Sequence, residues 1–214
     1  PEEYPSFDGD SPWLARARRN LQVMYRTALA VSHTLDIDEL LVRILDLIFE
    51  WVDADRGCVM LLDSESGSLI PKARRDRRAN GEGQTLSISR TILEYVLKNN
   101  EGVVTSNASD DQRWEAGRSI LTKGVREAIC VPMQGRYGTV GAIYVDTYTP
   151  PGQVVVQGTP QNFSSEHLKL MVAIGHQAAL AVEDTSYYSA LVEAERMAAM
   201  GKAIAGLSHD VKNI

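Results

Sequence analysis

Cysteine and histidine are both scarce in this sequence, which limits the covalent and metal chemistry open to it. Among 214 residues there are two cysteines and four histidines. Cys58 and Cys130 each lie in an apolar run typical of a strand, so we expect buried free thiols, as in a reducing cytosol, and no disulfide framework. The histidines are scattered and lack metal-ligand spacing with the cysteines, which argues against a metal site. They are His33, His167, His176 and His209.

Long hydrophobic runs and an excess of positive charge are also missing. The most apolar stretch, residues 40–52, is interrupted by Arg43, Asp46 and Glu50 and cannot span a membrane. The net charge of −6 argues against a general nucleic-acid binder, and the basic run at residues 72–78 is typical of a solvated strand end and loop. Without a signal peptide either, we expect a cytoplasmic protein with no nucleic-acid or membrane partner. The chain starts without methionine, and both ends look like cut points in a longer protein.

A polar segment precedes the first predicted helix. Residues 1–11 contain Pro, Gly and Asp and are typical of a linker, after which Ser11 can cap a helix that begins at Pro12. Apolar residues then recur at alternating steps of three and four, as in a coiled-coil heptad. They are Leu14, Ala17, Leu21, Met24, Ala28, Val31 and Leu35. We predict a dimerisation helix over residues 12–34, with simple packing on the chain's own domain as the alternative.

The middle of the chain alternates between helical and strand-like periods. Asp36 and Glu39 resemble a capping box and predict a second helix to about Val52. Short apolar runs bounded by turn clusters predict strands. The expected strands are 57–62, 68–75, 103–106, 127–134 and 140–147. The other expected elements are a loop at 78–84, a helix at 89–98 capped by Ser89, a loop at 107–113, a short helix around 114–122, a long loop at 148–162 and a last helix that begins at Phe163-Ser164.

This order of elements, together with several short motifs, resembles the GAF family of sensory domains. The motifs are LDIDELL at 35–41, ADRGCVMLLD at 54–63, VTSNASDDQRW at 104–114, AICVPM at 128–133, VGAIYV at 140–145 and FSSEHLKL at 163–170. The resemblance covers residues 35–184. It implies an α+β fold, in which helices pack on one side of a central antiparallel sheet and a ligand, where there is one, lies on the other side.

The ligand does not follow from the resemblance. The signature of cyclic-nucleotide-binding members is absent, and members that carry a bilin pigment attach it to a cysteine in a different context. Members that reduce methionine sulfoxide need several reactive cysteines, so a stand-alone enzyme on this scaffold is a weak alternative. We leave the GAF ligand unknown and expect a small molecule or none, because the strand residues that would line the pocket are mostly apolar.

The last predicted helix is longer than the domain requires. About fifty residues contain no proline and would extend roughly 75 Å, so the helix must leave the domain. A second heptad seam runs along its end, and we assign residues 185–214 to a signalling helix. The seam consists of Met197, Met200, Ile204, Leu207, Val211 and Ile214.

His209 occupies the heptad position farthest from this seam. An exposed imidazole on a rigid helix, beside Asp210, suits a phosphoacceptor: the ring nitrogen must reach an incoming phosphoryl group, and the carboxylate can orient the ring and accept its proton. An exposed histidine is more often only solvated. A metal phosphohydrolase would need further clustered ligands that this chain lacks.

The sequence Ser208-His-Asp-Val-Lys-Asn213 resembles the H-box of sensor histidine kinases, in a subgroup that carries Lys-Asn-Ile where the common form has Arg-Thr-Pro. By this resemblance, residues 185–214 comprise a signalling helix that continues into a truncated H-box helix. The resemblance implies that His209 is autophosphorylated, that Asp210 assists as general base, and that Asn213 positions water in the reverse, phosphatase reaction. It also implies ATP and Mg²⁺ in a kinase core and a response-regulator receiver domain as partner.

A change of register precedes the second seam. Tyr187, Leu191 and Ala194 predict Ala198 as the next seam residue, whereas the stronger downstream seam begins at Met197. We interpret this as a signalling junction, where rotation of the sensory helix could bias the downstream bundle between two states. A helix with no defined seam at this point is the alternative.

The sequence therefore predicts the sensory GAF domain of a cytoplasmic two-component histidine kinase, and the heptad seams at both ends predict a parallel homodimer. The 214 residues contain no Gly-rich ATP-lid or Asn-box sequence, so we expect no cofactor in them and no kinase activity from them alone. The alternative is a GAF dimer that regulates a different output, a nucleotide cyclase or transcriptional activator, with no phosphotransfer at His209. The residues that follow Ile214 in the parent protein would discriminate the two.

Overall fold

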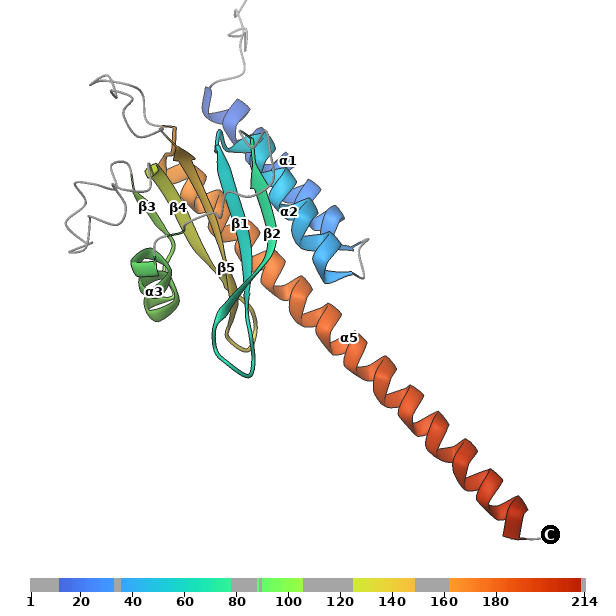
Figure 1. Ribbon diagram of the computed structural model, residues 1–214. Helices are drawn as coiled ribbons and strands as arrows, with labels where there is room; N and C mark the ends of the chain where they lie inside the picture. Colours follow the sequence, from blue (N-terminus) through green and yellow to red (C-terminus); the bar gives the residue numbers. More distant parts are fainter. Residues whose placement is uncertain are drawn as a thin grey trace, which may run out of the picture.

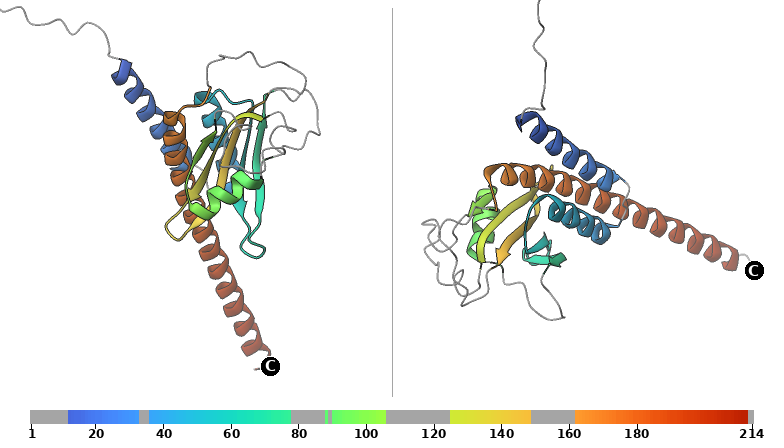
Figure 2. Two further views of the ribbon diagram at one scale, coloured as in Figure 1. Left: turned by 90° about the vertical axis from the view of Figure 1, so that its left-hand side faces the viewer. Right: turned by 90° about the horizontal axis from the view of Figure 1, so that it is seen from above.

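The computed structural model of the chain describes residues 12–32, 36–77, 88, 90–105, 125–148 and 162–212. These form a single sheet with helices on both faces (Figures 1 and 2). The elements are α1 (Pro12–Ser32), α2 (Ile37–Trp51), β1 (Arg56–Leu62), β2 (Leu69–Asp76), α3 (Arg90–Asn99), β3 (Val103–Thr105), β4 (Val125–Gln134), β5 (Thr139–Tyr148) and α5 (Ser165–Lys212).

The five strands form one antiparallel sheet in the order β2-β1-β5-β4-β3. The predicted α+β fold with a central antiparallel sheet is therefore confirmed. The expectation that helices pack on one side only is wrong, because α3 packs on the face opposite α2 and α5. Three strands are longer than predicted: β1 begins at Arg56, β4 already begins at Val125, and β5 spans Thr139–Tyr148. Strand pairing adds these residues, because hydrogen bonds to a neighbouring strand continue beyond the apolar run that marks a strand in the sequence.

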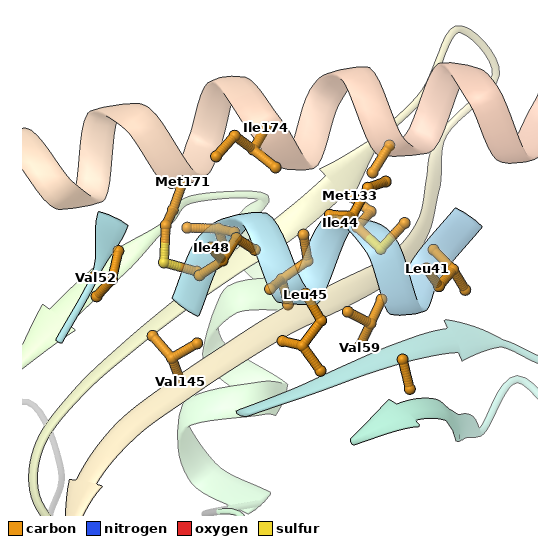
Figure 3. Close-up of a cluster of buried hydrophobic side chains, with 14 of the residues drawn as sticks. Leu41, Ile44, Leu45, Ile48, Val52, Val59, Met133, Val145, Met171 and Ile174 are labelled. Atoms are coloured by element: carbon orange, nitrogen blue, oxygen red, sulfur yellow. The ribbon is translucent and has the colours of Figure 1, made fainter. Parts of the chain in front are cut away.

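The main core lies between the sheet and the helices α2 and α5 (Figure 3). Alternate residues of the strands, including Val59 and Val145, point toward this side because side chains of a strand alternate between its faces. The helices α2 and α5 cover them with large apolar side chains. Those that Figure 3 labels on the two helices are Leu41, Ile44, Leu45, Ile48, Met171 and Ile174.

The predicted cap of α2 is present, although not as a full capping box. The Asp36 side chain accepts the backbone N–H groups of Asp38 at 2.8 Å and Glu39 at 3.0 Å. Glu39 does not complete the box, because its carboxylate pairs with Arg43 one turn later at 2.6 Å. The cap satisfies two of the N–H groups that a helix start leaves unpaired.

Helix α1 packs on its own domain, but not with the predicted seam. Val23 and Thr27 are its fully buried residues, and they lie one position to the side of the heptad stripe. Of that stripe, Met24 and Val31 pack partly against the core, whereas Leu14, Ala17, Leu21 and Ala28 are exposed. The alternative of packing on the chain's own domain is confirmed for one face of the helix, and dimerisation through the exposed residues stays a prediction.

Helix α5 leaves the domain as one continuous element, as predicted (Figure 1). Its first half packs on β4, β5, α1 and α2, and all described side chains from 186 to 200 are exposed. The polar linker 1–11, the loops at 78–84 and 107–113, the short helix around 114–122 and the cap Ser89 lie outside the described residues. Among the described helices, none combines the length and apolar character needed to cross a bilayer.

Candidate functional site

The predicted phosphoacceptor segment lies near the end of α5. His209 and Asp210 are in the last turn of this helix, which ends at Lys212, while Asn213 lies outside the described residues. From Asp184, where the helix leaves the domain, to His209 is about 37 Å at 1.5 Å per residue. The helix end and the sheet are thus far apart (Figure 2). The side chain of His209 lies outside the described part of the structure, so its exposure stays a prediction.

The seam residues whose side chains are described are exposed to solvent. Tyr187 is 74% exposed, Leu191 46%, Met197 64% and Met200 58%. Apolar side chains of this size, spaced by heptads on a projecting helix, are typical of a helix that pairs with another helix. The register change between Ala194 and Met197 lies in unbroken helix, so the backbone does not mark it.

The second candidate region is the face of the sheet opposite α2 and α5. Here a smaller apolar cluster joins β1, β3, β4 and β5 to α3. Its buried members are Cys58, Met60, Ile92, Val96, Val103, Ala128, Cys130, Ala142 and Tyr144. This is the side where the family resemblance places a ligand, and the buried side chains of the cluster are mostly apolar.

A buried polar group ends this apolar cluster. Arg56 of β1 donates from Nε and Nη2 to the two carboxylate oxygens of Asp146 on β5, at 2.8 and 2.7 Å. The hydroxyl of Tyr144 donates to the same carboxylate at 3.0 Å. The antiparallel register sets Arg56 directly opposite Asp146, and Tyr144 lies two residues along on the same face. All three side chains are largely shielded from water, so their polar atoms need hydrogen-bond partners within the protein.

Burial and charge perturb each member of this group. Burial raises the pKa of Asp146, and the neighbouring Arg56 guanidinium opposes that shift. Burial, with the Asp146 carboxylate beside it, raises the pKa of Tyr144 well above its ordinary value. For Arg56, burial would lower the pKa, but the contact with Asp146 outweighs it and the pKa is raised. Tyr144 therefore stays protonated and Arg56 charged at neutral pH.

The two thiols are buried and unreactive, as predicted. Both cysteines are free, and they flank Tyr144 across the sheet. Burial raises the pKa of Cys58 to about 11, with Arg74 opposing the shift, and raises that of Cys130 further. Thiols with a raised pKa are mostly protonated at neutral pH, and the thiolate is the reactive form, so burial lowers the reactivity of both cysteines.

A groove of about 320 Å³ lies between α1 and α2, on the helical side of the molecule. Leu29, Ala30 and Leu47 form its apolar part. Its charged lining residues are two cations and two anions, and each forms an ion pair: Arg26 with Glu50, Arg43 with Glu39, and Asp46 with Arg75. Because these charges already have partners, we assign no ligand to this groove.

No cluster of three or more metal-ligating side chains occurs within the part of the chain that the structure describes. The Arg56–Asp146–Tyr144 group was not predicted from the sequence. One signal was available: Asp146 follows Tyr144 at the two-residue spacing of one strand face, inside an apolar strand, where a charged residue needs a partner.

Comparison with known proteins identifies the domain. Residues 34–183 match the family model for the GAF domain. A curated relative, the probable 3',5'-cyclic phosphodiesterase pde-5 of Caenorhabditis elegans, is 25% identical over an alignment of 142 residues, and the match covers 61% of this chain and 20% of that protein. The chain thus spans about a fifth of the length of this relative.

Solved structures share the fold at low sequence identity. The free methionine-R-sulfoxide reductase of Neisseria meningitidis matches with a TM-score of 0.61 at 13% identity, covering 81% of this chain and 93% of that one. The GAF domain of an Acinetobacter phosphoenolpyruvate-protein phosphotransferase matches with 0.59 at 17%, covering 79% and 95%. The GAF domain of "a putative sensor histidine kinase" of Pseudomonas syringae pv. tomato matches with 0.52 at 12%, covering 84% and 96%.

Proposed function

The chain belongs to the GAF domain family, and within that family we propose that it is the sensory domain of a two-component histidine kinase. The observation that carries the proposal is helix α5, which runs unbroken from the core of the domain to Lys212 and contains most of the H-box-like sequence at residues 208–213. A continuous helix transmits a change of position from one end to the other. The fold likeness to the Pseudomonas GAF domain agrees with this reading.

In this proposal, the chemistry takes place at the far end of α5. The neutral imidazole nitrogen of His209 attacks the γ-phosphorus of ATP and takes up the γ-phosphoryl group, and ADP leaves. The ATP would be bound with Mg²⁺ by a kinase core of the parent protein. Asp210 orients the ring and takes up its proton, and Asn213 positions water for the reverse reaction. The phosphoryl group then passes to a response-regulator receiver domain.

A labelling experiment tests the role of His209. The natural gene product that contains these residues is incubated with γ-labelled ATP and Mg²⁺, and acid-labile phosphate on the protein is counted. We expect the His209→Gln variant to lose the label. The matched control is His167→Gln, on the same helix, where glutamine can serve in the capping box of Ser164. Equal labelling of His209→Gln and the parent would overturn the assignment.

We propose that the partner of the exposed seams is a second copy of this chain, arranged in parallel. Helix α1 presents Leu14 and Leu21 to solvent, 40% and 71% exposed, and α5 presents Tyr187 and Leu191. Helices α1 and α5 pack together within one chain, and each carries an exposed heptad stripe. Two such chains could therefore pair their stripes in a four-helix bundle.

Light scattering at micromolar concentration tests the dimer. We expect the mass of a dimer for the parent and a monomer for the Leu21→Glu, Leu191→Glu double variant, because each charge would be buried in the seam. Ile70→Glu is the control, since Ile70 is 44% exposed on the edge strand β2, away from both stripes. A monomeric parent would contradict the proposal.

A small molecule, if one binds, would lie on the sheet face that α3 covers. Native mass spectrometry of the purified chain would reveal a retained ligand, and melting curves with cyclic AMP and cyclic GMP would test two specific probes. The curated relative is a probable cyclic phosphodiesterase, which makes these nucleotides the informative choice.

A second candidate function is a GAF module that regulates a different output domain, either a nucleotide cyclase or a transcriptional activator. The relative from Caenorhabditis elegans favours it, because that protein is a probable phosphodiesterase, of which this chain spans a fifth. The labelling experiment separates the candidates: under the second, the parent acquires no acid-labile phosphate.

A further inference from the structure

The sheet holds α5 chiefly through one strand, β4. At its start, the buried carboxylate of Glu127 accepts two backbone N–H groups just before the helix begins, both at 2.9 Å. Further along, a Cβ at Gly175 of α5 would lie 2.9 Å from the carbonyl oxygen of Pro132, so helix and strand are in close contact. Near the end of β4, the carbonyl of Gln134 accepts the Nδ1–H of His176 at 2.6 Å.

The hairpin between β4 and β5 also contacts α5, at the point where the helix leaves the domain. The two carboxylate oxygens of Glu183 accept the backbone N–H groups of Arg136 at 2.9 Å and Tyr137 at 3.2 Å. The Arg136 guanidinium pairs with Asp184, the next residue of the helix. We call these contacts of Glu183 and Asp184 with residues 136 and 137 the exit clamp.

The exit clamp lies at the boundary between the packed and projecting parts of α5. Ala181 and Val182 are still buried, and from residue 186 to 200 every side chain is exposed. The hairpin is shaped to admit the carboxylate, because a Cβ at Gly135 would lie 2.1 Å from Glu183 Oε1. The clamp is therefore the last polar contact between sheet and helix among the described residues.

A second set of contacts joins the hairpin to α3 on the opposite face of the sheet. Helix α3 ends at Asn99, and Asn100 turns the chain with a φ of 51°, a left-handed conformation that asparagine tolerates. The hydroxyl of Thr139, at the start of β5, lies 3.1 Å from Asn100 Oδ1 and 3.0 Å from Gln134 Oε1. Contacts thus run without interruption from α3 to the hairpin and from the hairpin to α5.

We propose that the exit clamp is the coupling element of this domain: it converts a shift of α3 on the ligand-side face into a change in direction of α5. The lever is long, since Glu183 and His209 are about 39 Å apart along the helix, and a tilt of roughly 10° would move the far end by about 7 Å. The signalling consequence rests on the proposed function. The coupling itself is independent of the proposed function, because the experiment below measures the direction of α5 and not phosphorylation.

Spin-label distances test the clamp. Labels at Ser68→Cys and Glu195→Cys report the direction of α5 relative to the sheet, and both sites are exposed. The native thiols are buried and do not compete. Diluting the labelled chain in unlabelled chain isolates distances within one copy.

We expect Glu183→Gln and Gly135→Ala each to shift or broaden the distance by about 3–5 Å, since Glu195 lies roughly 18 Å beyond the clamp. Glutamine has one acceptor oxygen for two N–H groups, and the alanine methyl displaces the carboxylate. Glu166→Gln is the control, because it breaks only the exposed pair with Arg16 at the other end of α5.

A double-mutant cycle tests the coupling, which contacts alone do not establish. Asn100→Gly removes the side-chain contact with Thr139 and keeps the left-handed backbone favourable. We expect it to shift the Ser68–Glu195 label distance in the parent and to add nothing in the Gly135→Ala background. The proposal is overturned if both clamp variants leave the distance unchanged. It is equally overturned if Asn100→Gly has no effect, or has the same effect with the clamp broken.

Discussion

Replacing Asp146 by asparagine should destabilise the domain strongly, because it leaves a buried guanidinium without its carboxylate. The side chain of Arg56 is 11% exposed and that of Asp146 is 0% exposed, so water cannot take the place of the lost charge. Removing one partner of a buried ion pair costs about 3–5 kcal/mol. For a domain of this size, the melting temperature should fall by about 6 to 20 °C.

Replacing the other partner of the pair, in the variant Arg56→Met, should make the stability of the domain depend on pH. It leaves the Asp146 carboxyl buried, and burial raises the pKa of this group. The folded state then holds the proton more tightly than the unfolded chain, so stability is retained below the unfolded pKa and lost as pH rises through the folded pKa. We expect this variant to lose less stability, relative to the parent, at pH 5 than at pH 8. Urea unfolding followed by circular dichroism measures both values.

Two further variants decide whether the charge imbalance is the cause. Arg56→Met combined with Asp146→Leu removes both charges and should recover most of the lost stability. Breaking the exposed pair of Arg16 and Glu166, 57% and 46% exposed, should cost no more than about 1 kcal/mol. The reasoning is refuted if Asp146→Asn lies within about 1 kcal/mol of the parent, or if the double variant is no more stable than either single one.

Three other predictions follow from individual contacts. At pH 8, Cys58 and Cys130 should react with a thiol reagent about 100-fold or more slowly in the folded chain than in urea, because burial raises the pKa of both thiols; equal rates would contradict their burial. Asp36→Ala should cost about 1 kcal/mol, seen as a melting temperature about 2–4 °C lower, because it removes the cap of α2. Gly141→Ala should cost about 3 kcal/mol in urea unfolding, because its Cβ would lie 2.1 Å from the carbonyl oxygen of Met60 and must separate β1 from β5; an unchanged midpoint would contradict that contact.

Local patterns in the sequence predicted most of the elements. The apolar face of α2 and its cap at Asp36 are each encoded within a few residues of the sequence, and so are the short apolar runs of β1 and β4. The unbroken α5 also follows from a local property, the absence of proline after residue 160. The position of helix α1 along the chain was predicted, but the face that it buries was not. Its heptad stripe does not tell whether the neighbouring helix belongs to the same chain or to another.

The groups that join distant parts of the chain could not be predicted in the same way. Arg56 and Asp146 are 90 residues apart, and their pairing depends on the register between β1 and β5. Glu183 is 47 residues from Arg136 and meets only the backbone of the hairpin, which leaves no trace in residue type except Gly135. The H-box-like segment, in contrast, could be identified because its proposed chemistry lies in six consecutive residues of one helix.

The central claim is that His209 receives a phosphoryl group. Trypsin cleaves after Lys202 and Lys212, so it releases residues 203–212 as one peptide in which His209 is the only histidine. After incubation of the natural gene product with ATP and Mg²⁺, mass spectrometry under non-acidic conditions should find phosphate on this peptide, at His209, and acid treatment should remove it. A peptide without phosphate, or with acid-stable phosphate at Ser208, would contradict the claim.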